Sequence, residues 1–510
     1  EARGRKKFAP PPRRNSLRVA YKAASNDTLF GGSSMAARAK DLEAAIAATR
    51  FGLGARPGEL AKIGDARGWL LAQTASPAAF KLEQSGLVTT KEATEALASY
   101  REMAPERQAA KASGEKMKAA APAAASNAGD DPVFMMLRDL SVIATAEITA
   151  RANRALGSQT SFAERLVYFW ANHFTVAAVK ATTIPFVGVF EREAIRERMT
   201  GSFADLLLAV VRHPGMLLYL DQAQSVGPNS PGGRRRGLGL NENLAREILE
   251  LMTLGVHAGY TQADVTEFAR ALTGWTFAGP RTRRFARGAP IGDFIFVDLL
   301  HEPGARTVMG KRYADGGEDQ AEAILRDIAR HQATARHIAT KLARHFVADA
   351  PPESAIAALE QVFLETDGDL PSLHQALVAL PEAWAGAGEK FKAPNEFLLS
   401  ALRMVGVPKI EERGLLAGYG LVGQTPYRAS SPEGWPDDAA SWAAPDAVMK
   451  RLEWCQALAE RTGGRVKPEA LAKDALGPLL SAATIEAASR AQSAAQGLVL
   501  VLMSPDFQRR

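Results

Sequence analysis

Residues 241–250 form the densest polar cluster of the chain. The cluster comprises two asparagines, one arginine and three glutamates, namely Asn241, Glu242, Asn243, Arg246, Glu247 and Glu250. In a helix that begins near Asn241, spacings of three and four residues place most of these side chains over one sector. Two carboxylates on one face could bind a hard cation. Alternatively, Glu242 or Glu250 could act as acid or base while Arg246 holds an anionic substrate group.

The same cluster also has a purely structural interpretation. Asn241 would cap the helix, the acidic side chains of the first turn would complement the helix dipole, and Arg246 would form an ion pair. The sequence leaves both interpretations open.

A second cluster surrounds His173, which lies among aromatic residues in the segment WANHF. Aromatic walls with a few polar groups commonly line ligand pockets, and on this ground Trp170, Asn172 and His173 are candidate pocket residues. A lone histidine in an apolar segment is also typical of the protein core, where its ring nitrogens are bonded internally.

His301 is the third candidate, in a segment with the pattern of a hairpin. Together, His173, Glu247 and His301 would supply the mixed nitrogen and oxygen ligands that one divalent Zn, Mn or Fe ion accepts. No HExxH spacing is present, so folding would have to assemble such a site. Thr273 and Trp275 would join the same pocket, unless Gly274 merely ends a helix and Trp275 is buried in the core.

Two further polar segments favour structure over chemistry. His331, His337 and His345 lack the i, i+4 spacing that chelation on a helix favours. We interpret their helix as structural, with Arg336, Lys341 and Arg344 on its solvated or acid-facing side. The Gly- and Arg-rich segment 232–239 lacks the Gly-Lys-Ser/Thr of a phosphate loop, which favours a flexible basic loop beside the pocket.

The elements that must position these residues are helices. Apolar residues recur at helical spacing through most of the chain, and Ser161 with Glu164 predicts a capping box at one helix start. Between residues 277 and 313, alternation and turn residues replace this pattern. The expected fold class is therefore all-α, with one small β-hairpin near 294–313.

Composition divides the chain into regions. Residues 106–130 predict a low-complexity linker, and residues 1–34 show no periodicity. We expect residues 1–34 to be disordered and foreign to the natural protein, which would start at Met35; a twin-arginine export signal at Arg13 and Arg14 is the alternative. The other expected regions are N-terminal helical (35–105), central helical with the pocket (131–280), hairpin and loop insertion (281–318), and C-terminal helical (319–510).

Charge and composition exclude several classes of protein. Residues 1–34 carry the whole net charge of +6, so the remaining chain has no net charge and we expect no nucleic-acid partner. No segment approaches the roughly 18 apolar residues that a membrane span needs. The single cysteine, Cys455, excludes an internal disulfide and a cysteine-rich zinc site.

Six segments, in order, resemble one known family. They are AIAATRFGLGARPGEL, YFWANHFTV, NENLAREILELMTLGVHAGYTQADVTEFARALTGW, HEPGARTVMGKR, RHIATKLARHFVADAPP and the closing GQTPY…SPEGWPDDAASW…LMSPDFQRR, from about residue 44 to 510. The family is the bacterial domain of unknown function 1800 (DUF1800). The resemblance implies an all-α core, a bacterial source, no settled activity, and a DUF1501-family protein as a possible partner. Members are often exported, but the lack of a credible signal favours the cytoplasm here, with the periplasm or export as the alternative.

Two functions are compatible with these features. The first is an enzyme whose pocket is built from residues 170–174, 241–250, 271–275 and 301–302 and acts on an unknown small molecule or polymer, with metal-assisted hydrolysis as the first expectation. The second is a non-enzymatic binding or assembly protein whose polar clusters are ion-pair networks. The first requires the clusters to converge on an open cavity, and the second requires them to be paired and closed.

Overall fold

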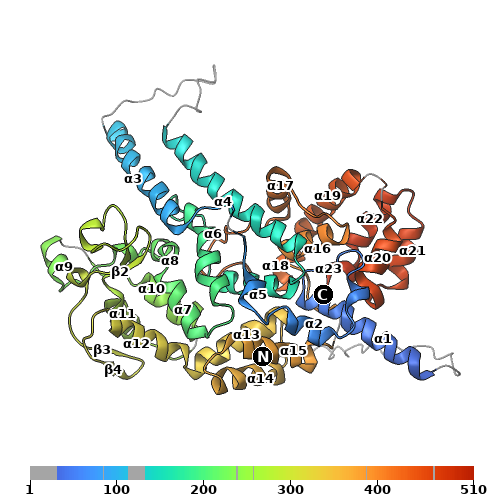
Figure 1. Ribbon diagram of the computed structural model, residues 1–510, viewed down its shortest axis with the longest axis horizontal. Coiled ribbons are helices and arrows are strands. Elements are labelled where there is room, and N and C mark those ends of the chain that lie inside the picture. Colours follow the sequence, from blue (N-terminus) through green and yellow to red (C-terminus); the bar gives the residue numbers. More distant parts are fainter. Residues whose placement is uncertain are drawn as a thin grey trace, which may run out of the picture.

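The computed structural model describes residues 31–83, 85–112, 132–236, 239–256, 258–385, 388–462, 464 and 466–510. Within these ranges helices predominate, accompanied by two small sheets (Figure 1), so the expected all-α class is confirmed. Most of segment 1–34 and residues 113–130 of the expected linker lie outside the described residues.

The helices fall into three groups along the chain. The first group is α1 (Gly31–Ile46), α2 (Ala66–Ala72), α3 (Thr90–Ala112), α4 (Pro132–Gly157), α5 (Ser161–His173) and α6 (Val187–Phe190). The second is α7 (Phe203–Arg212), α8 (Pro214–Tyr219), α9 (Pro231–Arg236), α10 (Asn243–Glu247), α11 (Gln262–Leu272), α12 (Glu318–Ala329) and α13 (Gln332–Phe346). The third is α14 (Glu353–Glu365), α15 (Leu370–Ala379), α16 (Pro394–Met404), α17 (Glu412–Val422), α18 (Ala439–Trp442), α19 (Pro445–Thr462), α20 (Pro468–Leu476), α21 (Ala482–Ser489), α22 (Ala494–Met503) and α23 (Pro505–Gln508).

The β structure consists of two antiparallel pairs where the sequence predicts one hairpin. β1 (Trp275–Phe277) pairs with β2 (Phe294–Phe296), and β3 (Arg306–Val308) pairs with β4 (Lys311–Tyr313). β1 has only three residues, Trp-Thr-Phe, and is separated from the end of α11 by two residues. Such a segment is too short for its alternation to be distinguished from a helix end.

Helix starts show where local sequence rules hold. Thr261 is the N-cap of α11 and forms a capping box with Asp264. The capping box expected at Ser161 is wrong, because Thr160 occupies the N-cap position of α5 and makes no side-chain cap bond. Glu164 instead forms a buried ion pair with Arg196, with an Nη2–Oε2 distance of 2.9 Å. A tertiary partner has replaced the local one.

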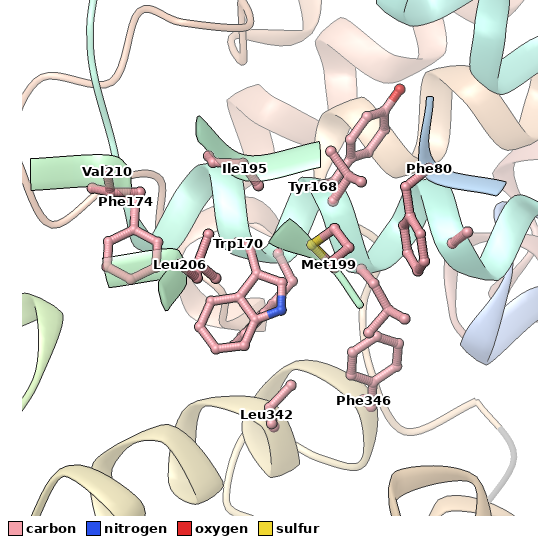
Figure 2. Packing of buried hydrophobic residues seen from close by; sticks show 14 of the residues in the cluster. Phe80, Tyr168, Trp170, Phe174, Ile195, Met199, Leu206, Val210, Leu342 and Phe346 are labelled. Carbon is pink, nitrogen blue, oxygen red and sulfur yellow. The ribbon is translucent and has the colours of Figure 1, made fainter. Parts of the chain in front are cut away.

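The main hydrophobic core surrounds α5, which lies at the centre of the molecule in Figure 1. Figure 2 shows Trp170 of this helix between Leu206 of α7 and Leu342 of α13. Trp170 also stacks on Phe174, with ring centroids 5.9 Å apart. Burying such large aromatic surfaces is the main stabilising contribution here, and it fixes the position of the polar side chains on the same helix.

No helix within the described residues combines the length and apolar character needed to cross a membrane.

Candidate functional site

The 241–250 cluster is held in a network of local hydrogen bonds. The Asn241 side chain accepts a hydrogen bond from the Asn243 backbone N–H at 2.9 Å. The expectation that Asn241 is the N-cap is wrong, because α10 begins at Asn243 and Glu242 occupies the N-cap position without a side-chain cap bond. Glu242 accepts hydrogen bonds from Thr266 (2.7 Å), Gln262 (2.8 Å) and Arg246 (3.1 Å). These bonds, with the one from Thr266 contributing most, lower the pKa of Glu242. The Glu242 carboxylate is therefore hydrogen-bonded to neighbouring side chains of the protein.

Glu247 and Glu250 are close enough to interact, as their helical spacing predicts. Burial, followed by the charge of Glu250, raises the pKa of Glu247. Glu250 in turn accepts a hydrogen bond from Tyr260. Both carboxylates are partly buried, and neither lines the cavity described below.

His301 and Thr273 meet, but as parts of a packed turn. The His301 Nδ1 atom lies 2.9 Å from the Thr273 carbonyl oxygen, and the Glu302 N–H donates to the Thr273 hydroxyl at 2.8 Å. Glu302 accepts from the backbone and side chain of Asn229 at 2.7 and 2.6 Å. Trp275 is buried beside this turn. Each of these contacts connects elements of the fold.

His173 is buried beneath the aromatic residues of α5. Its Nε2 atom lies 3.0 Å from the carbonyl oxygen of Met252, in a π-helical turn that follows α10. Among the described residues, no three His, Cys, Asp or Glu side chains are grouped so that they could hold a metal ion. The structure thus places His173, Glu247 and His301 in three separate contact networks, and the divalent metal stays a prediction.

A cavity of about 390 Å³ lies between α5, α13, the start of α16 and residues 424–438. We call it the α5–α13 cavity. Its polar lining includes Arg151, Arg165, Asn172, His173, Lys341, Arg344, His345, Asn395, Glu396, Glu433 and Asp437. Of the pocket residues predicted from sequence, Asn172 and His173 line it, and segments 241–250, 271–275 and 301–302 lie elsewhere.

Asn172 holds one wall of the cavity in place. Its side-chain amide donates to the Trp435 carbonyl at 2.9 Å and accepts from the Trp435 N–H at 2.8 Å. Gly434 has a φ of +89°, and a Cβ atom there would lie 2.4 Å from the Asn172 carbonyl oxygen. Only glycine allows this close approach without displacement of the backbone.

A His–Asp pair lies at the cavity wall. The His345 Nδ1 atom is 2.7 Å from Asp437, and Asp437 also accepts from the buried Lys390 at 3.2 Å. Burial alone would raise the pKa of Asp437. The positive charge that His345 carries when protonated, the hydrogen bond from its ring and the charge of Lys390 outweigh that effect and hold the pKa well below its usual range. Asp437 is therefore a carboxylate that orients the imidazole, as in acid–base pairs of enzymes.

Burial lowers the pKa of His345 more than Asp437 raises it. The His345 Nε2 atom is buried without a hydrogen bond, 3.9 Å from the Glu396 carboxylate. A neutral imidazole with Nδ1–H donated to Asp437 leaves Nε2 as a proton acceptor.

Glu396 is the buried centre of a charged cluster behind the cavity. Arg510 donates to its Oε2 atom from Nε at 2.8 Å and to its Oε1 atom from Nη2 at 3.1 Å, and Arg165 pairs with the same Oε1 atom. Burial would raise the pKa of Glu396, but the charges of Arg165 and Arg510 lower it to about 2. Arg165 is thereby neutralised, although it lines the cavity.

Two cations of this cavity, Lys341 and Arg344, form no hydrogen bond and no ion pair within the described residues. Arg344 is exposed, whereas Lys341 is half-buried. Burial lowers the pKa of Lys341 to about 8, and the nearby charges of Glu433 and Asp437 only partly oppose that effect. By contrast, the Arg151 guanidinium pairs with Glu191 at 2.7 Å.

Sequence reasoning missed Lys341, His345, Glu396 and Asp437. The α13 helix appeared structural because its histidines lack chelate spacing, and Asp437 is separated from His345 by 92 positions. No local pattern could signal that contact, since the pair exists only after the 424–438 segment has folded against α5.

Comparison with known proteins gives one match. The family model described as "Protein of unknown function (DUF1800)" matches residues 46–509. Neither a curated protein nor a solved structure matches the chain.

Proposed function

The chain belongs to the DUF1800 family of proteins of unknown function, and from this premise we propose that it binds a small carboxylate- or phosphate-bearing ligand in the α5–α13 cavity. One observation carries the proposal, namely the half-buried Lys341 ammonium on the cavity wall, which has no partner among the described residues. Partial burial of an unpaired charge is unfavourable, so an anionic ligand would remove an energetic cost that the free protein bears. Concave sites with a few convergent polar groups and a shifted pKa are typical of ligand pockets.

The neighbouring groups would allow chemistry on such a ligand. Asp437 orients His345, whose Nε2 atom would accept or return a proton once ligand binding gives it access to the cavity. Lys341 would hold the anionic group and Glu433 and Arg344 would lie beside it. In this proposal Lys341 and His345 are the catalytic residues, and Asp437 and Asn172 are positioning residues.

Metal-assisted hydrolysis remains a more specific form of the enzyme hypothesis. It requires a divalent ion bound by His173, Glu247 and His301, and these side chains contact different segments of the fold. Anion binding at Lys341 does not depend on that ion, so the two hypotheses are tested separately.

A non-enzymatic assembly protein is the second candidate function. It is favoured by the pairing of the polar clusters first noted in the sequence, because Glu242 and Glu302 accept hydrogen bonds from neighbouring protein groups. Under this alternative the α5–α13 cavity would bind no small anion.

Isothermal titration calorimetry with citrate, pyrophosphate and inorganic phosphate tests the proposal. We expect at least one of these anions to bind at pH 7 and to bind about tenfold or more weakly to Lys341→Met, because a hydrogen bond to a charged group contributes roughly 1.5–3 kcal/mol. Binding should also weaken as the pH rises through about 8, where Lys341 loses its charge. Lys450→Met, on the exposed surface of α19, is the matched control. Failure of all three anions to bind, or equal binding by Lys341→Met, would contradict the proposal.

A further inference from the structure

A second cavity, of about 270 Å³, lies between α3 and the turn that follows β1. We call it the α3–β1 cavity. One wall of the cavity is a face of α3 formed by Thr94, Leu97, Ala98 and Arg101, which follow helical spacing. The opposite wall comes from residues 276–282, and residues 223 and 224 border the cavity at the side. The cavity shares no lining residue with the α5–α13 cavity.

Close backbone packing fixes the two walls relative to one another. Gly292, just before β2, has a φ of +94°, and a Cβ atom there would lie 2.7 Å from the Thr90 methyl group at the start of α3. The β1 end is closed by a tight turn in which Thr282 donates to the Phe277 carbonyl at 2.6 Å. The cavity is therefore a feature of packed elements, and both walls are held by the fold.

Apolar and basic side chains share the lining. Leu97 and Phe277 are buried and present apolar surface, while Arg101 is half-buried and Arg281 lies exposed at the cavity. The Thr94 and Thr282 hydroxyls already donate to backbone carbonyls at 2.8 and 2.6 Å. The two guanidinium groups are thus the free cationic donors of the cavity.

The charges of Arg101 and Arg281 are uncompensated within the described residues. Neither forms an ion pair or hydrogen bond there, although Glu102 also borders the cavity. Burial, and then the charge of Arg281, lower the pKa of Arg101, so the two like charges interact. Two guanidinium groups that repel one another beside an apolar surface are stabilised when an anion lies between them.

We propose that the α3–β1 cavity is a binding site for a small amphipathic carboxylate. The carboxylate lies between the planar guanidinium groups of Arg101 and Arg281, which match its geometry, and its hydrocarbon part lies against Leu97, Ala98 and Phe277. The volume is slightly below the roughly 300 Å³ at which pockets for drug-sized ligands begin, which selects a short aliphatic or a single-ring carboxylate.

Calorimetric titration of the full chain with octanoate, 1-octanol and inorganic phosphate tests the site. We expect octanoate to bind, octanol and phosphate to bind at least tenfold more weakly, and the double variant Arg101→Gln/Arg281→Gln to lose at least tenfold in octanoate affinity. Arg283→Gln is the matched control, since Arg283 is exposed in the same segment but does not line the cavity. This control should bind octanoate as the wild type does.

A second variant keeps the test decisive if the double variant is unstable. Ala98→Trp retains both arginines and fills the cavity from α3, so it should abolish octanoate binding. Octanoate binding that is absent in the wild type, unchanged in either cavity variant, or matched by octanol would overturn the proposal. Phosphate binding as tight as octanoate would likewise overturn it, because the apolar surface would then contribute nothing.

Discussion

Replacing Glu396 by glutamine should destabilise the protein by several kilocalories per mole. The side chains of Glu396, Arg165 and Arg510 are only 10%, 2% and 1% exposed, so the substitution leaves two buried guanidinium groups without their anion. Ion pairing lowers the pKa of Glu396 from 4.5 to about 2. At roughly 1.4 kcal/mol per pKa unit this difference corresponds to about 3 kcal/mol at neutral pH. Breaking a buried pair typically costs about 3–5 kcal/mol, which is consistent with that figure.

The direction of the pKa shift of Glu396 determines how the stability of the protein changes with pH. Because the folded-state pKa is lowered, the stabilisation is fully present above the unfolded-state value near 4.5 and is lost as the pH falls towards 2. Urea unfolding of wild type and Glu396→Gln should therefore differ by about 3–5 kcal/mol at pH 7 and by progressively less between pH 5 and pH 3.

An exposed glutamate provides the matched control. Glu353 pairs with Arg336 on the surface, where its side chain is 69% exposed, and Glu353→Gln should change stability by less than about 1 kcal/mol. The reasoning is refuted if Glu396→Gln is as stable as this control at pH 7, or if its deficit does not change between pH 5 and pH 3.

Three further predictions concern the candidate sites. If the metal hypothesis holds, plasma mass spectrometry of untagged protein should find a near-stoichiometric divalent metal that is lost in both His173→Ala and Glu247→Ala. Wild-type protein that contains no metal, together with variants that are only less stable, would contradict the hypothesis. In urea unfolding, Gly434→Ala should lower the free energy of unfolding by at least about 1 kcal/mol more than Gly423→Ala does. Both positions have a positive φ, but a Cβ atom meets the Asn172 carbonyl oxygen only at Gly434. Equal losses of stability in the two variants would contradict this prediction. Asn172→Leu should speed proteolytic cleavage within residues 424–438 by severalfold, since it removes both hydrogen bonds to Trp435, and an unchanged cleavage rate would show that the segment is held by other contacts.

The polar clusters show how far residue types alone can lead. Arg246 fits the structural interpretation, because its i, i+4 ion pair with Glu242 is a local interaction that spacing predicts. Asn241 does not occupy the N-cap position that the sequence predicts for it, because α10 begins one residue later than that position would require. Asn172 is a candidate pocket residue by sequence and lines the α5–α13 cavity, but its hydrogen bonds reach Trp435, 263 positions away, which no local pattern predicts. The histidine spacing of α13 argues against chelation, yet Lys341 and His345 of this helix line the same cavity.

The sequence by itself determined the helical class and the family, because apolar periodicity and ordered motifs are properties of neighbouring residues. The tertiary structure decided which charges are neutralised and which are free. Glu164 pairs with Arg196 and does not form the predicted capping box, and Glu396 pairs with both Arg165 and Arg510. Lys341 has no partner in the part of the chain that the structure describes. The physical reason is that desolvation and ion pairing depend on which distant segments are packed together, and spacing along the chain contains no measure of that distance.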